Sequence, residues 1–469
     1  MSGIEAVPPS RTDPMARSWS ERTGGPVGSH GRPHAWLTPV RVLLAVFTIV
    51  SCLGIVQKIP CMQTHWTNSE VRYSKMCYSD IPYLYTGRGM AEQVWPYSDT
   101  HGRYAVMEYP VGISYFAWGA AWLTKPFAAG PSEQVRAASP PDAFFGLAGM
   151  VTEVNQYFLV NAVLLIAAGL LATYFMAGAH RRRPWDALAF AASPMLMLTG
   201  LINWDVLAVA AVAGSFWAWA RGKPVLAGVF LGLGTATKLY PLFLFGAMLV
   251  VCLRRGQPAV FVKALVAGLV TWLVVNLPAL LTGFDQWKVF WRFNAARGPD
   301  LGSLWIMASN LGHPASSETI NVTAWVLFSL ACIGVLVLGL TANYPPRMAQ
   351  LGFLIVAAFL LVNKVYSPQY VLWLLPLAVL ARPRWRDLLI WQACELFYFA
   401  SVWFYLGGFT ASATSGATDP LYLVAIPVRV IGELYLMFLV TRDILDPSGD
   451  PVRNGETLVG LGKTPARAG

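Results

Sequence analysis

Charged residues interrupt three long apolar stretches of this sequence near their midpoints, at Asp205, Lys238 and Lys364. A charge at the centre of a bilayer costs about 2.5–3.5 kcal/mol on insertion scales, so such residues usually mark a functional site. Each lysine is followed within four residues by a tyrosine and a proline, and proline prevents a helix from continuing straight. Either the lysines bind an anionic group such as phosphate, or each extends its ammonium group to the membrane surface.

Two carboxylates in a polar stretch after the first apolar segment could act in acid–base chemistry. Asp80 lies in CYSDIPYLYTGRGM, where Ser-Asp before Ile-Pro indicates a helix start. It is either an N-cap or a general base near the membrane surface, and we expect the base. Glu108 precedes Tyr-Pro and an apolar run. It is either a surface acid favoured by the helix dipole or a second catalytic carboxylate that orients the base or the acceptor.

A further cation and several polar residues complete the candidate site. Arg297 lies in FWRFNAARGPDLGSLW and either binds phosphate in a bidentate manner or only pairs with Asp300. Tyr366 and Gln369 either hydrogen-bond a sugar or satisfy the backbone groups that a helix break leaves free. The predicted substrate-binding residues are Lys238, Arg297, Asp205, Asn203, Tyr240, Lys364, Tyr366 and Gln369.

The composition is that of a membrane protein, with 56% hydrophobic and 12% charged residues and a mean hydropathy of +0.50. The net charge of +10 then reports which loops are cytoplasmic, and we expect no nucleic-acid partner. The sequence has no metal-type Cys/His spacing, phosphate-binding glycine loop or hydrolase elbow. We therefore expect no cofactor, and a divalent metal is not indicated.

The basic loops constrain how the chain crosses the bilayer. If residues 224–252 formed one helix, it would be about 44 Å long, more than the roughly 30 Å core requires. It would also place Arg254 and Arg255 outside, against the positive-inside rule. Two short helices that break at 238–241 keep both basic ends inside. The same argument predicts hairpins over 186–220 and 349–381, so that three hairpins carry Asp205, Lys238 and Lys364 to one place.

The predicted fold is therefore an all-α bundle of about 12 transmembrane helices, several of them short or broken, with both termini in the cytoplasm. Residues 110–124 are either an interfacial helix or a re-entrant piece. Cys61 and Cys77 are either a disulfide or two free thiols. The first apolar segment lacks a clear cleavage site, so we expect it to be retained. The predicted segments are disordered tails at 1–36 and 444–469, a transmembrane catalytic domain at 37–443, and extracytoplasmic loops at 58–152 and 282–319.

Carboxylates and cations that meet under the outer headgroups suit a substrate with an anionic head and an apolar tail. A polyprenyl-phosphate sugar has both. The cations would hold the phosphate as it leaves, while a carboxylate deprotonates the acceptor hydroxyl.

Several of these segments resemble known glycosyltransferases. A long first loop with Asp80, followed by Glu108-Tyr109-Pro110, resembles the GT-C superfamily. The segments SPMLMLTGLINWDVLAVAA (193–211), AGVFLGLGTATKLYPLFL (227–244) and YSPQYVLWLLPL (366–377) resemble actinobacterial members of family 87. Those members are polyprenyl-phosphate-mannose-dependent mannosyltransferases, and the similarity covers roughly residues 40–400.

The resemblance implies an inverting transfer with Asp80 as the base, and Lys238 matches the family's lysine before Leu-Tyr-Pro. The sequence departs from the family at Tyr109-Pro110-Val111, where Tyr-Pro-Pro is usual, and at Asn203-Trp204-Asp205, where Gly-Gln is common.

We therefore expect an integral glycosyltransferase of the plasma membrane that acts on the outer face. It would move a sugar, mannose first, from a polyprenyl-phosphate donor to an envelope glycolipid or polysaccharide. The alternative is a transporter or a flippase for lipid-linked sugars, because broken helices also occur in transporters; a third is a non-catalytic scaffold. The long first loop with its carboxylates and the lack of an obvious inverted repeat favour the enzyme.

Overall fold

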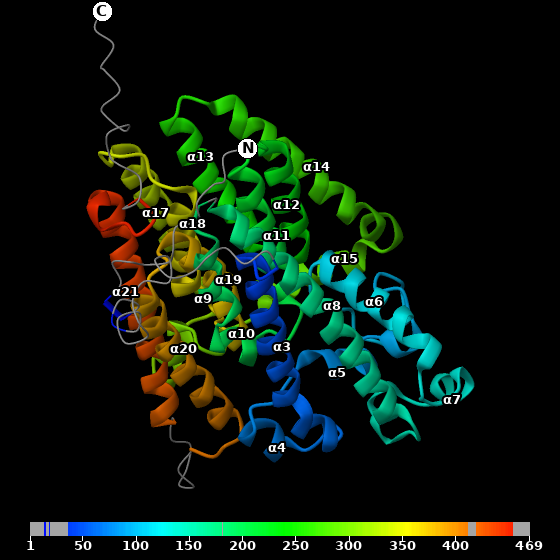
Figure 1. The fold of residues 1–469 in the computed structure, drawn as a ribbon. Coiled ribbons are helices and arrows are strands. Elements are labelled where there is room, and N and C mark those ends of the chain that lie inside the picture. The colour runs from blue at the N-terminus through cyan, green and yellow to red at the C-terminus, as the bar shows by residue number, and fades with distance from the viewer. Residues whose placement is uncertain (1–13, 16–17, 19–35, 181, 411–418, 454–469) are drawn as a thin grey trace, which may run out of the picture.

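The computed structural model describes residues 14–15, 18, 36–180, 182–410 and 419–453. Within these ranges the chain is helical and contains no strand, which confirms the expected all-α fold (Figure 1). The N-terminal tail predicted at 1–36 lies almost wholly outside the described residues.

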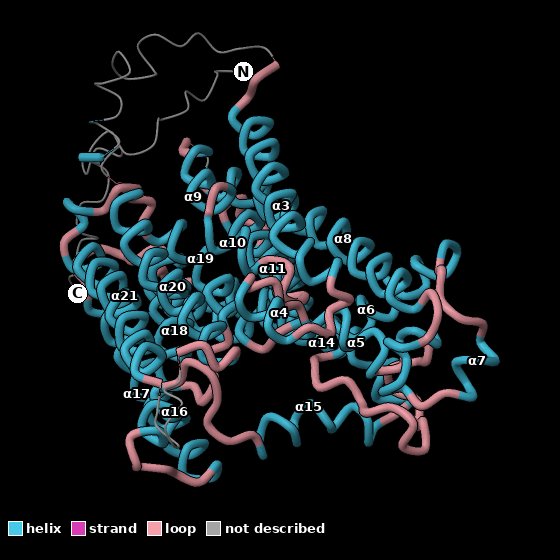
Figure 2. The backbone as a smooth tube through the Cα atoms, turned by 90° about the horizontal axis from the view of Figure 1, so that it is seen from below, coloured by secondary structure: helices cyan, strands magenta, loops and turns pink. Residues whose placement is uncertain are grey.

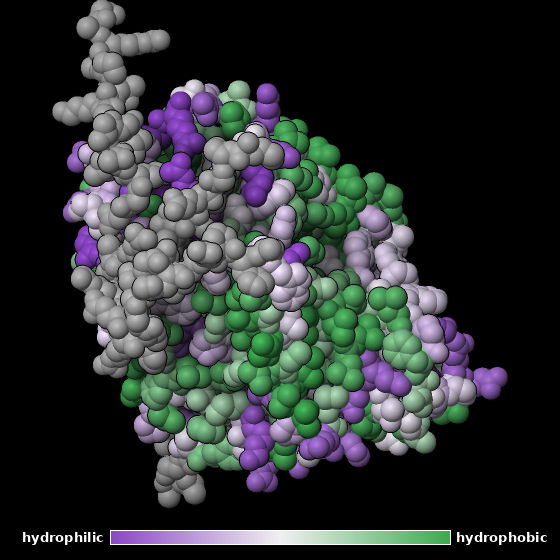
Figure 3. All heavy atoms as spheres, in the orientation of Figure 1, coloured by the Kyte–Doolittle hydropathy of each residue, from purple (hydrophilic) through white to green (hydrophobic). Residues whose placement is uncertain are grey.

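Among the described residues, six helices are long and apolar enough to cross a membrane. The 25 residues of the first would span about 38 Å at 1.5 Å per residue, more than the hydrocarbon core. A broad band of hydrophobic residues crosses the visible face of the molecule, with hydrophilic residues above and below it (Figure 3). The six are α3 (Pro39–Gln63), α8 (Met150–Ala179), α14 (Pro258–Thr282), α17 (Ser317–Thr341), α20 (Trp385–Leu406) and α21 (Pro420–Leu445).

The predicted helix breaks are confirmed, and they divide the remaining bundle into shorter apolar helices. Proline follows two of the breaks, at Pro241 and Pro368, where a 3-10 turn restarts the chain. The pieces are α10 (Pro194–Thr199), α11 (Asp205–Trp219), α12 (Pro224–Thr237), η5 (Tyr240–Phe243), α13 (Leu244–Arg254), α18 (Met348–Val362), η6 (Pro368–Tyr370) and α19 (Val371–Ala381).

The first arm of the first hairpin differs from the prediction. Residues 186–202 are not one helix but η4 (Pro184–Ala187), α9 (Leu188–Ala191) and α10. Ser193 starts α10 anew, since its side chain accepts a hydrogen bond from the Leu196 amide and Pro194 follows it.

The first loop is built from short helices joined to the bundle. Cys61 and Cys77 form a disulfide, which settles the open alternative. The helix over the apolar stretch 110–124 is too short to span, at about 21 Å, and it packs on α8 and α12. The elements are α4 (Ser69–Ser74), α5 (Asp80–Gly87), η1 (Met90–Glu92), α6 (Val111–Thr124), η2 (Lys125–Phe127), α7 (Glu133–Ala138) and η3 (Pro141–Gly146).

The second loop contains α15 (Phe284–Ala296) and α16 (Leu304–Asn310). Viewed from below in Figure 2, α15 lies along the edge of the molecule between α14 and α16. None of its side chains is fully buried, and its aromatic residues alternate with Lys288 and Arg292. This mixture is typical of a helix that lies in the membrane interface.

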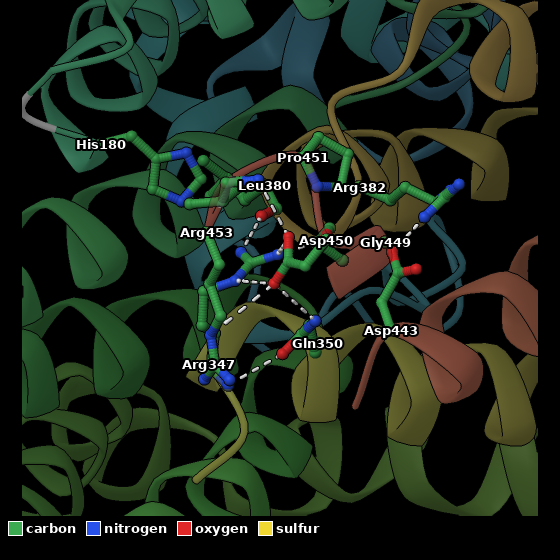
Figure 4. A network of polar contacts seen from close by, with 12 residues as sticks. His180, Arg347, Gln350, Leu380, Arg382, Asp443, Gly449, Asp450, Pro451 and Arg453 are labelled. Carbon is green, nitrogen blue, oxygen red and sulfur yellow. Dashed lines mark hydrogen bonds and ion pairs between the residues drawn. The ribbon is translucent and has the colours of Figure 1, made fainter. Parts of the chain in front are cut away.

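The predicted C-terminal tail begins too early at residue 444. Helix α21 continues to Leu445, and η7 (Pro447–Gly449) leads to Asp450, which is fully buried. Arg347 reaches the Asp450 carboxylate at 2.9 Å, and Gln350 and Arg453 point at the same group (Figure 4). This polar network packs residues 446–453 against the bundle, so at least the part up to 453 is not a disordered tail.

The network joins the ends of α18 and α19 that lie farthest along the chain from their common break. Arg347 precedes α18 and donates to the carbonyls of Leu380 and Ala381 at the end of α19. Arg382, directly after α19, pairs with Asp387 and Asp443. The two arms of this hairpin are therefore fixed at one end by ionic contacts, and at the break the Lys364 carbonyl accepts a hydrogen bond from the Asp300 amide at 2.8 Å.

Candidate active site

The three helix breaks and both predicted loops surround one cavity of about 700 Å³. Its wall includes Asp80 and Glu108 from the first loop, Lys238 from the second hairpin, Arg297 from the second loop and Lys364 from the third hairpin. The structure therefore brings the predicted carboxylates and cations together, although they lie up to 284 positions apart in the chain (364 − 80).

Asp80 is held in the cavity wall by two tyrosines. Its Oδ1 accepts a hydrogen bond from Tyr78 at 2.6 Å and its Oδ2 accepts one from Tyr109 at 2.8 Å. The N-cap interpretation is wrong, because Ser79 caps α5 and leaves the Asp80 carboxylate free for these contacts. The Asp80 amide donates to the Ile202 carbonyl at 2.7 Å, which docks this turn on the first hairpin break.

The environment of Asp80 favours a proton acceptor. Burial raises the pKa of its carboxyl above the ordinary value, and the hydrogen bonds from Tyr78 and Tyr109 only partly offset this shift. Each carboxylate oxygen can accept a further hydrogen bond beyond the phenol that it already holds. A carboxylate with a raised pKa that opens into a cavity is suited to remove a proton from a hydroxyl group.

Glu108 also lines the cavity, but an arginine holds it. Arg88 donates to both Glu108 oxygens at 3.0 Å, in a bidentate pair. Glu92, four positions after Arg88, pairs instead with Arg103 at 2.8 Å. A carboxylate shared with a guanidinium is a better orienting group than a base.

Lys238 reaches the cavity with a buried carboxylate behind it. Its Nζ lies 2.7 Å from Oδ1 of Asp205, whose Oδ2 accepts from Trp373 Nε1 at 2.8 Å. Asn203 in turn accepts from the Asp205 amide at 3.0 Å. Asp205 and Asn203 are buried and lie outside the cavity wall, so in this structure neither faces the cavity, and their predicted role toward substrate stays a prediction. The reason is that both side chains turn inward from the break to hold its other residues.

The aromatic residues of the hairpins divide between wall and core. Tyr240 stacks on Trp373 at 4.8 Å and lines the cavity, as does Gln369. No described residue hydrogen-bonds the Tyr240 hydroxyl. Tyr366 is not in the wall: its hydroxyl lies 3.0 Å from both oxygens of Glu395 in the core. Tyr366 therefore does not face the cavity in this structure, because its side chain follows the inner face of the break.

The two remaining cations lie close together at the second loop. Arg297 donates from Nε to Asp300 at 2.9 Å, so the predicted pairing is present, and its side chain also lines the cavity. Lys364 donates to Asn321 Oδ1 at 2.7 Å and to the Ala295 carbonyl at 3.3 Å. No acidic group among the described residues pairs with Lys364. Lys364 is buried and lines the cavity, with its ammonium group held by these two acceptors.

Sequence reasoning missed several residues that hold the site. Lys58, in α3, is fully buried and donates to the Tyr78 carbonyl at 2.8 Å, which fixes the turn before Asp80. The sequence prediction placed Lys58 at the start of the first loop, whereas the structure extends the helix to Gln63 and so brings this lysine within it. Nothing in the sequence indicated Tyr78 or Trp373, since their roles depend on contacts with distant segments.

No group of three or more His, Cys, Asp or Glu residues in the described parts of the chain is arranged to hold a metal ion. The charges in the cavity are thus the side chains named above, and they can bind an anion and accept a proton.

Comparison with known proteins shows a similarity over one segment of the chain. No curated protein matches the chain. The model of glycosyltransferase family 87 matches residues 138–363, a segment that contains the first two hairpins, the second loop and the first arm of the third hairpin. Asp80 and Glu108 precede the matched segment, whereas Lys238 and Arg297 lie within it. The matched segment is slightly less than half of the chain, and over it the chain, with apolar helices and broken hairpins around one charged cavity, is similar to glycosyltransferase family 87.

Proposed function

We propose that the protein transfers a sugar from a polyprenyl-phosphate donor to an acceptor hydroxyl of an envelope glycolipid or polysaccharide. The observation that carries the proposal is the cavity in which the Asp80 carboxylate shares a wall with three cations. A phosphate leaving group and a hydroxyl nucleophile need these two kinds of group. Mannose is the proposed sugar, on the resemblance of 193–211, 227–244 and 366–377 to mannosyltransferases that use such donors.

The reaction we propose is a single displacement. Asp80 takes the proton of the acceptor hydroxyl, whose oxygen attacks the anomeric carbon of the sugar as the bond to the phosphate oxygen breaks. The polyprenyl phosphate leaves with the bonding electron pair, and its charge lies near Lys238, Arg297 and Lys364. One displacement inverts the anomeric configuration. Glu108, held by Arg88, orients the acceptor.

The apolar part of the cavity suits the lipid tail. Phe290 and Phe293 of α15, Trp325 and Phe328 of α17 and Phe359 of α18 line it. Trp325 is 54% exposed on the outside of the bundle, where it would contact lipid. A chain of isoprene units can pass between α15 and α17 into the bilayer while its phosphate stays at the cations.

We place this cavity on the extracytoplasmic side of the plasma membrane. The Cys61–Cys77 disulfide lies in the first loop, and disulfides persist in oxidising compartments. The basic residues Arg347, Arg382 and Arg453 lie at the far ends of the hairpin arms, where the positive-inside rule favours the cytoplasm.

The direct test is transfer from radiolabelled polyprenyl-phosphate mannose by purified protein in detergent, with Asp80→Asn as the variant. We expect Asp80→Asn to lose about 10²- to 10⁴-fold in rate, the usual contribution of a general base, while donor binding persists. Asp99→Asn is the matched control, since Asp99 is an exposed acid of the same loop. Turnover by Asp80→Asn at the wild-type rate would remove Asp80 from its role.

The same variant separates loss of chemistry from loss of fold. Because burial raises the Asp80 pKa in the folded state, the charged form costs folding free energy at neutral pH, and this cost disappears as pH falls through that pKa. We therefore expect Asp80→Asn to unfold at a temperature no lower than the wild type. Detergent also removes any gradient, so transfer there argues against a transporter or flippase.

A further inference from the structure

A fully buried arginine lies behind the two cations at the second loop. Arg429, within α21, is 0% exposed and takes no part in the cavity wall. Its Nη1 donates to Glu433, one turn later in the same helix, at 2.8 Å. A buried ion pair adds little net stability over apolar residues of similar volume, because both charges lose their hydration. The other contacts of Arg429 are therefore more informative than the pair itself.

These other contacts join two separate segments of the chain. Arg429 Nη2 donates to the Gly302 carbonyl of the second loop at 3.3 Å. The guanidinium carbon lies 3.7 Å from the centre of the Tyr366 ring, at the third break. A guanidinium group stacks favourably on an aromatic face in this way. One side chain of α21 thus contacts both the loop that carries Arg297 and the break that carries Lys364.

The loop and the break are also bonded directly to each other. The Asp300 amide donates to the Lys364 carbonyl at 2.8 Å. The Tyr366 amide donates to the Leu301 carbonyl at 2.6 Å. Asp300 is also the residue whose carboxylate pairs with Arg297. These two backbone hydrogen bonds therefore set the position of Arg297 relative to Lys364.

Two tyrosines complete the attachment of this junction to the helices behind it. Tyr398 of α20 donates its hydroxyl to the Tyr366 carbonyl at 2.6 Å. The Tyr422 hydroxyl of α21 accepts from the Gly302 amide at 2.8 Å. The side chains of Tyr398, Tyr422 and Arg429, all buried, are named here the buried clamp. Both backbone polar groups of Gly302 are thus bound by the clamp.

The loop lies so close to the buried clamp that position 302 needs glycine. Gly302 has a φ of +68°, which residues with a Cβ rarely adopt. A Cβ there would overlap the Tyr398 hydroxyl and lie 2.5 Å from the Tyr366 carbonyl oxygen. Gly312, in the same loop, has a φ of +88°, but a Cβ there would meet no described atom within 4 Å. The two glycines therefore separate backbone strain from overlap with the clamp.

The cavity gives a physical reason for such a clamp. Arg297 and Lys364 both line it, and two cations in one cavity repel each other when no anion is bound. One lies in a loop and the other at a helix break, so no continuous helix fixes either of them. A rigid attachment from behind holds them in place before the ligand arrives, which lowers the entropy that binding must spend on ordering.

We propose that Arg429 is a positioning residue that holds Arg297 and Lys364 together as one phosphate-binding subsite. It acts through the backbone at Gly302 and the ring of Tyr366, and it does not touch the substrate. The inference rests on the proposed function, because the phosphate concerned is that of the donor. It predicts that changes made outside the cavity weaken the binding of phosphate inside it.

The test measures binding of geranyl phosphate, a short isoprenoid phosphate, to the full chain in detergent by titration calorimetry. Geraniol is the matched compound that lacks the phosphate. Gly302→Ala brings a methyl group against the clamp without changing any charge. We expect it to weaken geranyl phosphate binding about tenfold, the effect of losing one hydrogen bond to a charged group, and to leave geraniol binding unchanged. Gly312→Ala is the matched control, and it should leave the binding of both compounds unchanged.

A second variant tests Arg429 itself and guards against a change of fold. Arg429→Met alone would leave Glu433 as a buried carboxylate without its cation, which is strongly destabilising. Arg429→Met together with Glu433→Gln removes both charges and should fold, with the same loss of geranyl phosphate affinity. In the transfer assay this double variant should raise the KM for the donor but not the KM for the acceptor. Arg347→Met with Asp450→Asn is the matched control, because it removes an ion pair at the other end of the third hairpin.

The outcomes separate this inference from the proposed function. If the wild type prefers geranyl phosphate to geraniol, but folded Gly302→Ala and the Arg429 double variant bind geranyl phosphate as the wild type does, the positioning role alone is wrong. An equal loss of affinity in Gly312→Ala or in the Arg347 double variant would show a general change of structure and would also overturn the role. If the wild type does not distinguish geranyl phosphate from geraniol, the phosphate subsite of the proposed function is wrong, and the positioning role is wrong with it.

Discussion

Replacing Lys238 by methionine tests how the cavity charge is held. The Lys238 ammonium lies 2.7 Å from Asp205, which is fully buried. At an effective dielectric constant of about 20, that separation corresponds to about 6 kcal/mol of Coulomb energy. Part of this energy is offset by desolvation, and breaking a buried pair on one side typically costs about 3–5 kcal/mol.

The structure also predicts an asymmetry between the two partners. Lys238 lines the cavity and can reach water, whereas Asp205 is 0% exposed. Lys238→Met leaves a buried carboxylate with Trp373 as its remaining side-chain donor among the described residues, so it should destabilise more than Asp205→Asn. The double variant removes both charges and should recover most of the lost free energy of unfolding.

The assay is reversible unfolding in mixed micelles with rising SDS, followed by tryptophan fluorescence, together with transfer activity for each variant. If Lys238 also binds the donor phosphate, the double variant regains stability but not activity. Additive losses in the double variant would refute the ion pair as a stabilising contact. Wild-type transfer by a stable double variant would refute the phosphate role of Lys238.

Three further perturbations follow from the described contacts. Tyr109→Phe removes a hydrogen bond that lowers the Asp80 pKa, so the acid limb of the pH–rate profile should move to higher pH; an unmoved limb would assign that limb to another group. Cys61→Ser with Cys77→Ser should cost about 3 kcal/mol of stability for a loop of this length, and dithiothreitol should then destabilise only the wild type in a thermal unfolding scan. Asp450→Asn should destabilise the protein, because it removes the charge that Arg347 pairs with in Figure 4, and it should leave the KM for the donor unchanged. A changed KM would show that the ends of α18 and α19 at this network are coupled to the cavity.

The sequence allowed the convergence of the hairpins to be predicted, because two physical constraints act locally. A charge within an apolar run is costly, and basic loops must stay on one side. Together they required breaks at Asp205, Lys238 and Lys364, and the structure has all three. These constraints depend on composition along the chain and need no knowledge of packing.

The direction in which each side chain points could not be predicted in this way. Tyr366 and Gln369 are three positions apart at one break, yet one binds Glu395 in the core and the other lines the cavity. Asp205 was expected to meet substrate, but it turns inward to hold Lys238. Which side of a helix break faces the cavity depends on the helices that pack against that break, and these come from remote parts of the chain, such as α20.

The way each cation is neutralised orders their roles in binding a phosphate. Lys238 faces the buried Asp205, and Arg297 shares the half-exposed Asp300, so a carboxylate already balances each of these charges. Lys364 has only the Asn321 amide and a carbonyl as partners, and among the described residues no acid neutralises it. A buried cation without a counter-ion is unfavourable until an anion arrives, and the Lys364 charge is therefore the one that a leaving phosphate would stabilise most. Under the proposed function, Lys364 is for this reason a stronger candidate for the phosphate than its position in the sequence indicated, and Lys238 and Arg297 would add to the positive field beside it.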